Sequence, residues 1–193
     1  HATAKNIKEN YKGKFPDSYQ EILSLKGIGP YTAAAIASIA FGLPYPALDG
    51  NIYRVLARYF GIFDSPATGK GKKVFLKLAE ELISNENPGF HNQALMEFGA
   101  LQCVPKSPEC SACTLKPTCF AFQKKQLDNL PVKTAKLKLR TRYFYYYFID
   151  SGENTWLEKR IGNDIWEHLY QLPLVESEQE LSAEEILKIK PPF

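Results

Sequence analysis

The chain of 193 residues contains no apolar run near the roughly 20 residues that a membrane-spanning helix needs, which excludes a transmembrane segment. Its first residues, HATAKNIKENYKGK, have no apolar core of the kind that a signal peptide requires. Methionine is nearly absent: the chain begins with His1 and its one methionine is Met96, so we expect part of a longer protein. Cysteine is absent outside residues 103–119, and nothing indicates secretion, so disulfides are disfavoured.

A large excess of one charge is also absent, because the net charge is only +3. The charge is unevenly distributed, however. Residues 104–142 carry nine Lys or Arg against two carboxylates, and residues 151–193 carry four against nine. This pattern predicts a surface for a polyanion in the middle of the chain, and a solvated lysine-rich linker is the alternative. The 45% apolar and 23% charged residues are ordinary for a soluble globular protein.

Capping residues and apolar periodicity predict that the first part of the chain is helical. Ser18, with Glu21 three residues later, can begin one helix, and Asp49 can begin another. Gly69 and Gly71 predict a loop before the next helix. The expected helices cover residues 2–12, 19–25, 30–41, 50–60, 72–84 and 88–103.

After residue 142 the pattern changes. Residues 143–149, YFYYYFI, predict a strand, which a turn joins to a partner strand at residues 155–159. Ser182 and Glu185 predict a short capped helix to Lys188. Because two or three strands are not stable alone, we expect this region to be the start of a larger α+β domain. The basic residues 123–142 are predicted to be an interdomain linker.

The cysteines Cys103, Cys110, Cys113 and Cys119 form the pattern C-x6-C-x2-C-x5-C. Zinc sites usually combine two close C-x2-C pairs, whereas this pattern has one, which favours a 4Fe–4S cluster over zinc or unligated thiols. The first arm contains two prolines and is predicted to present Lys106 to a phosphate. The alternative is that the cluster only staples a loop.

A glycine turn, Lys26-Gly27-Ile28-Gly29-Pro30, precedes a helix rich in alanine. The amide N–H groups from Ile28 to Tyr31 lack intrahelical acceptors and lie at a helix N-terminus, which favours an anion such as a nucleic-acid phosphate. Carbonyl groups of the same turn are predicted to hold a monovalent cation. A plain packing joint between two helices is the alternative.

The stretches LKGIGPYTAAAI, ALDGNIYRVLAR and HNQALMEFG, followed by the cysteine pattern, occur in this order. Together they resemble the helix–hairpin–helix DNA glycosylases with an iron–sulfur cluster, and within these the adenine DNA glycosylases that act opposite 8-oxoguanine or guanine. Residues 155–173 resemble the start of that family's Nudix-like domain, which recognises the oxidised guanine. The resemblance implies a mainly α glycosylase core at residues 1–122, without its N-terminal helices, and a partial Nudix-like domain at residues 143–193.

The resemblance also implies roles for individual residues. Asp49 matches the catalytic carboxylate, which would stabilise positive charge on the sugar, and Asn51 matches a residue that places water or holds Asp49. Tyr31 stands where the endonuclease III group has a lysine, and a phenol forms no Schiff base, so we expect a monofunctional enzyme. A helix cap and simple packing are the alternative roles for Asp49 and Tyr31. The residues expected to bind DNA are Lys26, Gly27, Ile28, Gly29, Tyr31, Thr32 and Lys106.

The family's general-acid Glu, in a stretch rich in Trp, Arg, Pro and Gln, is missing from this chain. We therefore expect the chain as given to bind DNA without turnover. The expected partner is double-stranded DNA with adenine opposite 8-oxoguanine or guanine, bound by a monomer with no membrane association. The expected location is the bacterial cytoplasm, at the nucleoid, or the eukaryotic nucleus. The alternatives are an endonuclease III-like glycosylase for damaged pyrimidines and a metal-stapled DNA-binding module without chemistry.

Overall fold

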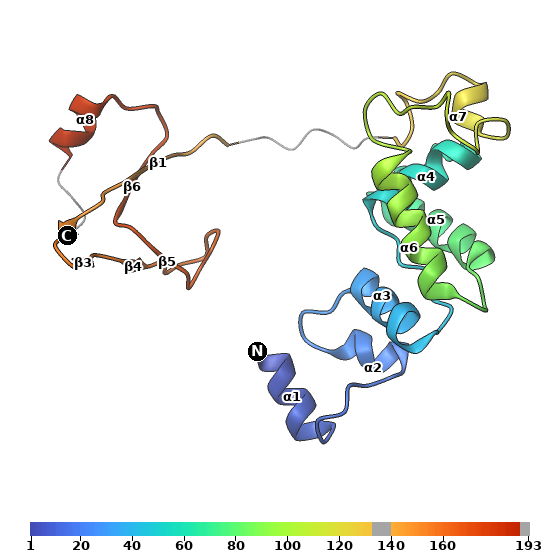
Figure 1. The fold of residues 1–193 in the computed structure, drawn as a ribbon, viewed down its shortest axis with the longest axis horizontal. Coiled ribbons are helices and arrows are strands. Elements are labelled where there is room, and N and C mark those ends of the chain that lie inside the picture. The colour runs from blue at the N-terminus through green and yellow to red at the C-terminus, as the bar shows by residue number, and fades with distance from the viewer. Residues whose placement is uncertain (133–139, 190–193) are drawn as a thin grey trace. The chain divides into compact units, whose positions relative to one another are not determined.

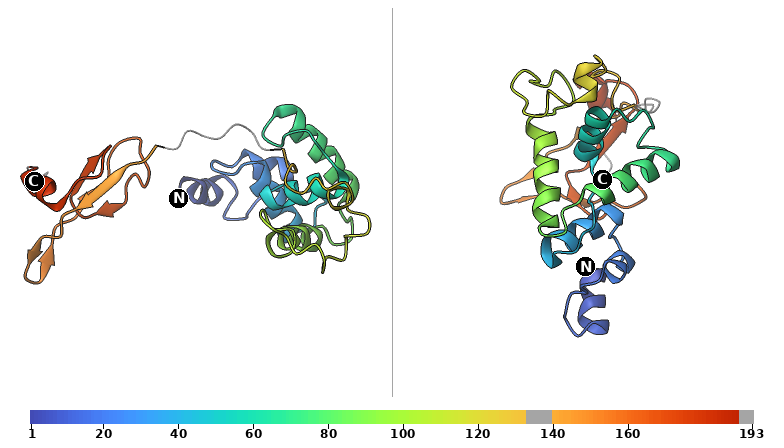
Figure 2. Two further views of the ribbon diagram at one scale, coloured as in Figure 1. Left: turned by 90° about the horizontal axis from the view of Figure 1, so that it is seen from above. Right: turned by 90° about the vertical axis from the view of Figure 1, so that its right-hand side faces the viewer.

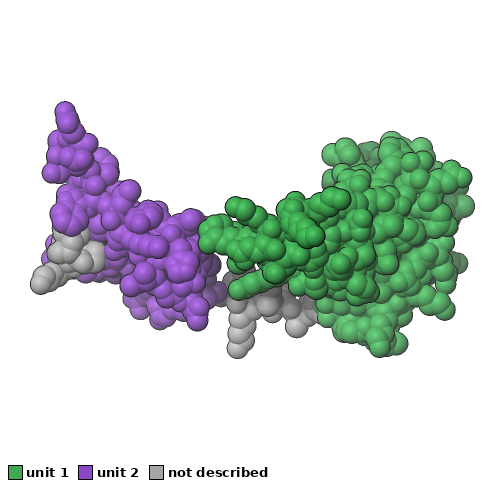
Figure 3. Space-filling view, turned by 90° about the horizontal axis from the view of Figure 1, so that it is seen from below, with its two compact units in different colours: residues 1–135 green, residues 136–193 purple. Residues whose placement is uncertain are grey.

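The computed structural model describes residues 1–132 and 140–189. The chain divides into two compact units, residues 1–135 and 136–193, which are coloured separately in Figure 3. Part of the predicted linker, including Lys133, Lys136 and Lys138, lies outside the described residues. Among the described helices, none has the length and apolar character that crossing a membrane requires.

The first unit is helical, as the sequence predicts (Figure 1). Its helices are α1 (Ala2–Asn10), α2 (Tyr19–Ser24), α3 (Pro30–Phe41), α4 (Gly50–Phe60), α5 (Gly69–Leu82), α6 (Pro88–Leu101) and α7 (Phe120–Gln123).

Capping side chains fix where these helices begin. The Ser18 hydroxyl accepts a hydrogen bond from the Glu21 N–H at the start of α2, as predicted. The prediction for α5 is wrong at its first turn, because the helix begins at Gly69 and not at Lys72. The Thr68 hydroxyl accepts from the Gly71 N–H at 3.0 Å, and this N-cap outweighs the low helix propensity of glycine in the first turn.

Helix α6 packs against both α3 and α4 and lies alongside α4 in Figures 1 and 2. One apolar cluster joins α4 to α5 and is centred on Ile52, Leu56 and Phe75. A second cluster lies in the α2–α3 hairpin and contains Ile22, Ala33 and Ala37. Helix α6 therefore connects the α2–α3 hairpin to α4, and α4 in turn packs against α7, which follows the cysteine loop.

The second unit contains short antiparallel strands and one helix. The strand pairs are β1 with β6, β2 with β3 and β4 with β5. Their bounds are β1 (Tyr143–Tyr146), β2 (Asp150–Ser151), β3 (Asn154–Thr155), β4 (Glu158–Lys159), β5 (Tyr170–Gln171) and β6 (Leu174–Ser177), followed by α8 (Ala183–Lys188).

The predicted strand pairing in this unit is wrong. The strand expected at residues 143–149 ends at Tyr146, and its partner is β6, with Tyr145 opposite Val175. The segment expected as one partner strand, residues 155–159, is divided between β3 and β4. The α8 prediction is confirmed, because Ser182 and Glu185 form a complete capping box.

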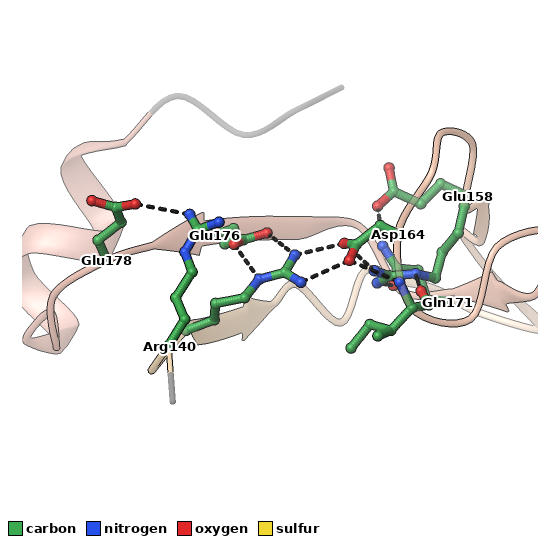
Figure 4. A network of polar contacts seen from close by, with 9 residues as sticks. Arg140, Glu158, Asp164, Gln171, Glu176 and Glu178 are labelled. Carbon is green, nitrogen blue, oxygen red and sulfur yellow. Dashed lines mark hydrogen bonds and ion pairs between the residues drawn. The ribbon is translucent and has the colours of Figure 1, made fainter. Parts of the chain in front are cut away.

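A network of charged side chains joins the strands of the second unit (Figure 4). The Arg142 guanidinium donates to both carboxylate oxygens of Asp164, at 2.7 and 2.6 Å, and also to Glu176. Arg160 adds a contact to Asp164 at 3.1 Å. Hydrogen bonds from Arg142 lower the pKa of both Asp164 and Glu176. Arg142 was predicted as part of a stretch that faces a polyanion, but its positive charge is paired with Asp164 and Glu176 inside this unit.

Candidate active site and thiol cluster

The glycine turn between α2 and α3 leaves several amide groups free. Gly27 has φ of 87°, in the left-handed region that favours glycine. The Ile28 N–H, predicted to lack an intrahelical acceptor, bonds the Leu25 carbonyl within the turn at 3.1 Å and is therefore not available to an anion. Within residues 1–132 and 140–189, no acceptor is paired with the amide N–H groups of Gly29, Tyr31 and Thr32.

These three amides lie at the first turn of α3, where Gly29 is the N-cap and Pro30 is the first residue. The helix dipole adds a partial positive charge at this point. Lys26 and Thr32 are both exposed beside the turn. The Lys26 carbonyl accepts a hydrogen bond from the Thr3 hydroxyl, which ties α1 to the turn. The arrangement can bind one oxyanion without reading a base.

Asp49 is the N-cap of α4, as predicted, and both of its carboxylate oxygens are anchored. Oδ1 accepts from the Ile52 N–H at 2.7 Å, and Oδ2 accepts from the Asn51 side-chain amide at 2.8 Å. Asp49 and Asn51, both predicted as site residues, are thus in direct contact. The carboxylate is half-buried and its direction is fixed, which suits a group that must face a developing positive charge.

The structure adds Arg54, which the sequence analysis missed. Its guanidinium donates to the Asn51 side-chain oxygen at 2.8 Å, to the Gly99 carbonyl at 2.6 Å and to the Cys103 carbonyl at 2.7 Å. Arg54 is nine-tenths buried, and this burial lowers its pKa. The sequence does contain a signal for a buried arginine here, because Arg54 and Arg58, four residues apart, interrupt an amphipathic helix. Arg54 therefore links the Asp49 pair to the cysteine loop.

Tyr31 lies on the exposed side of α3, with 43% of its surface accessible. Its hydroxyl donates to the Met96 sulfur on α6 at 3.4 Å. It also lines a pocket of about 450 Å³ with Leu48, Tyr53, Lys72 and others. Leu48, which directly precedes Asp49 in the sequence, lines this pocket, but Asp49 itself is not among its lining residues. Lys72 brings an amine to this pocket that the sequence analysis did not identify.

All four cysteines line one small cavity of about 30 Å³, together with Arg58 and several apolar side chains. Burial, followed by the neighbouring thiols, raises the pKa of Cys110. The described residues contain no preassembled group of three or more metal-ligating side chains. Four thiols around one apolar cavity are nevertheless a donor set suited to soft metal ligation. The four cysteines lie within a span of 17 residues, and their ligation of a cluster stays a prediction.

Arg58 holds the cysteine loop to α4 and is only 3% exposed. Its guanidinium donates to the Cys103 sulfur at 3.4 Å and to the Val104 carbonyl at 2.8 Å. The same group also donates to the carbonyl oxygens of Pro105, Leu127 and Leu130. One buried charge thereby binds segments 45–72 residues further along the chain. Residues 127 and 130, predicted as linker, therefore belong to the first unit.

Lys106 directly follows the anchored Pro105 carbonyl, and its side chain is exposed. The structure thus holds the backbone before Lys106 and leaves the amine in solvent. Among the described residues, those that line the pocket at Tyr31 do not include Lys106.

Comparisons with known proteins identify the class of fold. A helix-hairpin-helix motif matches residues 10–39. The solved structure of a thermostable thymine-DNA glycosylase is 33% identical, has a TM-score of 0.56, and aligns over 63% of this chain and 56% of its own. An endonuclease III–DNA complex aligns with a TM-score of 0.53 at 28% identity, over 63% of this chain and 55% of its own. The first unit has the helix–hairpin–helix fold of DNA glycosylases.

Within this class, the sequence is similar to adenine DNA glycosylases. The adenine DNA glycosylase of Buchnera aphidicola subsp. Acyrthosiphon pisum is 36% identical over 178 residues, which are 92% of this chain and 51% of that protein. The chain thus spans about half the length of this relative. The resemblance inferred from the ordered sequence stretches is confirmed.

Proposed function

We propose that the protein carrying this chain is a monofunctional DNA glycosylase of base-excision repair. It hydrolyses the N-glycosidic bond of adenine paired with 8-oxoguanine or guanine. The observation that carries this proposal is the doubly anchored carboxylate of Asp49, in a chain similar to adenine DNA glycosylases over 92% of its length.

The hairpin supplies the DNA contact in this proposal. The free amides of Gly29, Tyr31 and Thr32 bind one backbone phosphate, assisted by the charge of Lys26. Carbonyl groups of the turn, which includes Gly27 and Ile28, hold a monovalent cation that bridges to the same phosphate. Lys106 contacts a second phosphate from the cysteine loop. Double-stranded DNA as the partner implies a cytoplasmic or nuclear location, and the protein acts as a monomer.

The chemistry falls to Asp49, Asn51 and Tyr31. Departure of adenine develops positive charge on the sugar, and the fixed carboxylate of Asp49 stabilises it. Asn51 holds that carboxylate through one oxygen and leaves lone pairs free to orient a water. Tyr31 lines a pocket together with Leu48, the residue before Asp49, and provides no amine. The acid that protonates adenine is assigned to a residue outside the 193 of this chain.

The cysteine loop holds a 4Fe–4S cluster in this proposal, with Cys103, Cys110, Cys113 and Cys119 as ligands. The cluster would supply covalent cross-links within a loop that has no helix or strand between Cys103 and Cys119 among the described residues. Arg58 keeps the backbone of the loop in place beside it. Residues 143–193 form the start of a Nudix-like domain that recognises the oxidised guanine.

The test uses the full-length natural protein and duplexes that contain adenine opposite 8-oxoguanine, guanine or thymine. Alkali-dependent strand cleavage is expected for the first two and not for the third. Asp49→Asn should reduce excision by at least 10²-fold while leaving duplex affinity intact, since fixed electrostatic groups contribute about that much. Absence of adenine release by the wild type would refute the proposal.

The same preparation separates the alternatives. Borohydride should trap no covalent complex, because neither Tyr31 nor Asp49 forms a Schiff base. If a complex is trapped, Lys26→Ala and Lys72→Ala identify the responsible amine, and the monofunctional assignment is wrong. Release of an oxidised pyrimidine instead of adenine would favour an endonuclease III-like enzyme. Binding with no release of any base would favour a module without chemistry.

A further inference from the structure

The segment that carries Asp49 has little backbone support of its own. Residues 42–48 cross from α3 to α4, and Pro44 and Pro46 have no N–H to donate. The Tyr45 N–H bonds the Leu43 carbonyl, only two residues earlier. Ala47 is fully buried, so its N–H needs a partner from another element.

Asn92 on α6 supplies that partner. Its side-chain oxygen accepts from the Ala47 N–H at 3.1 Å, and its amide donates to the Tyr45 carbonyl at 2.9 Å. The same amide donates to the Ser38 hydroxyl on α3 at 2.9 Å. Asn92 is 1% exposed, and these contacts use its oxygen and both amide hydrogens. One side chain therefore joins the hairpin helix, the crossover segment and α6.

The backbone of α6 is held close to both neighbours, so Asn92 projects from a rigid frame. A Cβ on Gly89 would lie 2.8 Å from the Ser38 carbonyl oxygen. A Cβ on Gly99 would lie 2.7 Å from the Asn51 Cβ. Thus α6 contacts α3 at one end and α4 at the other, and Asn92 fixes the crossover between those two contacts.

We propose that Asn92 is a positioning residue that sets where Asp49 stands relative to the hairpin amides. This inference rests on the function proposed above. Its two bonds to residues 45 and 47 end two residues before Asp49, so a change in them shifts the carboxylate. The phosphate-binding amides belong to α3 and keep their place. Displacement of a reacting group by about 1 Å can cost about 10²-fold in rate.

The main variant is Asn92→Asp in the full-length protein. The substituted carboxylate keeps the size and the acceptor for the Ala47 N–H, but it turns lone pairs toward the Tyr45 carbonyl, where Asn92 donates. The matched control is Ser38→Ala, which removes the third partner and leaves both crossover bonds. Excision of adenine opposite 8-oxoguanine is measured in single turnover with enzyme in excess, and duplex affinity is measured separately.

The expected rate constant of Asn92→Asp is 10- to 100-fold below wild type, with duplex affinity within threefold. Ser38→Ala should match wild type in both. If Asn92→Asp only destabilises the fold, fewer molecules are folded, so the reaction amplitude falls while the rate constant stays at the wild-type value. An unchanged rate constant with a lower amplitude would overturn the inference. If the wild type excises no adenine, the proposed function fails first.

Hydrogen exchange tests the inference on the wild type, whether or not the variant folds. The Ala47 amide should be strongly protected, because its one partner is a buried side chain on another helix. Exchange of that amide at the rate of an open loop would overturn the inference.

Discussion

Replacing Arg58 with lysine should loosen the cysteine loop. The guanidinium donates to four carbonyl oxygens and one sulfur, whereas an ammonium has three donors on a narrower head. At least one carbonyl loses its partner, and each one orphaned in a buried place costs about 1–3 kcal/mol. With five acceptors and three donors, at least two bonds are lost. Water can replace a bond lost at the exposed Pro105, so we assign the cost to one orphaned buried carbonyl, at about 2 kcal/mol, the middle of that range.

Local opening of residues 103–119 measures this change directly. A cost of about 2 kcal/mol raises the open population about 30-fold, at 1.4 kcal/mol for each factor of ten. Amide exchange of the loop in Arg58→Lys should accelerate by that factor, and a chelator should remove the iron of the proposed cluster correspondingly faster. Lys106→Ala is the matched control, because it changes an exposed lysine of the same loop and should leave exchange unaltered. Exchange within threefold of wild type in Arg58→Lys would refute the assigned role.

Two further changes test other parts of the chain. Gly27→Ala places a Cβ at φ of 87° and should cost about 1–2 kcal/mol of stability, as well as weakening duplex affinity, which denaturation and binding titrations measure. In the second unit, hydrogen bonds from Arg142 lower the pKa of Asp164 and Glu176. The two ionised carboxylates therefore stabilise the folded unit fully above the ordinary carboxyl pKa, and this contribution is lost as the pH falls through the lowered values. The near-ultraviolet circular dichroism of that unit should therefore stay constant from pH 7 to about pH 5 and decline toward pH 2. Arg142→Gln should reduce this acid transition. An identical acid transition in the variant would contradict the stabilising role assigned to Arg142.

The helices could be predicted because their signals are local. Ser18, Asp49 and Ser182 each cap a helix with a side chain that reaches three residues along the chain. Where a local signal competed with another, the prediction was less accurate. The two glycines at positions 69 and 71 indicated a loop, but the Thr68 cap extends the helix over both.

The strands of the second unit could not be paired from the sequence. Adjacent segments with β-branched and aromatic residues suggested a hairpin from residue 143 to residue 159. In the structure, Tyr145 faces Val175, 30 residues away. Pairing at that separation depends on the packing of the intervening chain and on charge contacts such as Arg142 with Asp164, and neither is encoded in a short window.

At the candidate site, the sequence by itself determined which groups are present: a glycine turn before a helix, the carboxylate of Asp49 at a helix start, and four thiols within 17 residues. These groups can be identified from residues that lie close together in the sequence and from the chemistry of each side chain. Tertiary structure alone decided how the groups are held. Arg54, Arg58 and Asn92 form hydrogen bonds across 45 to 72 residues, because a buried donor takes whichever carbonyl the packing of the helices brings to it.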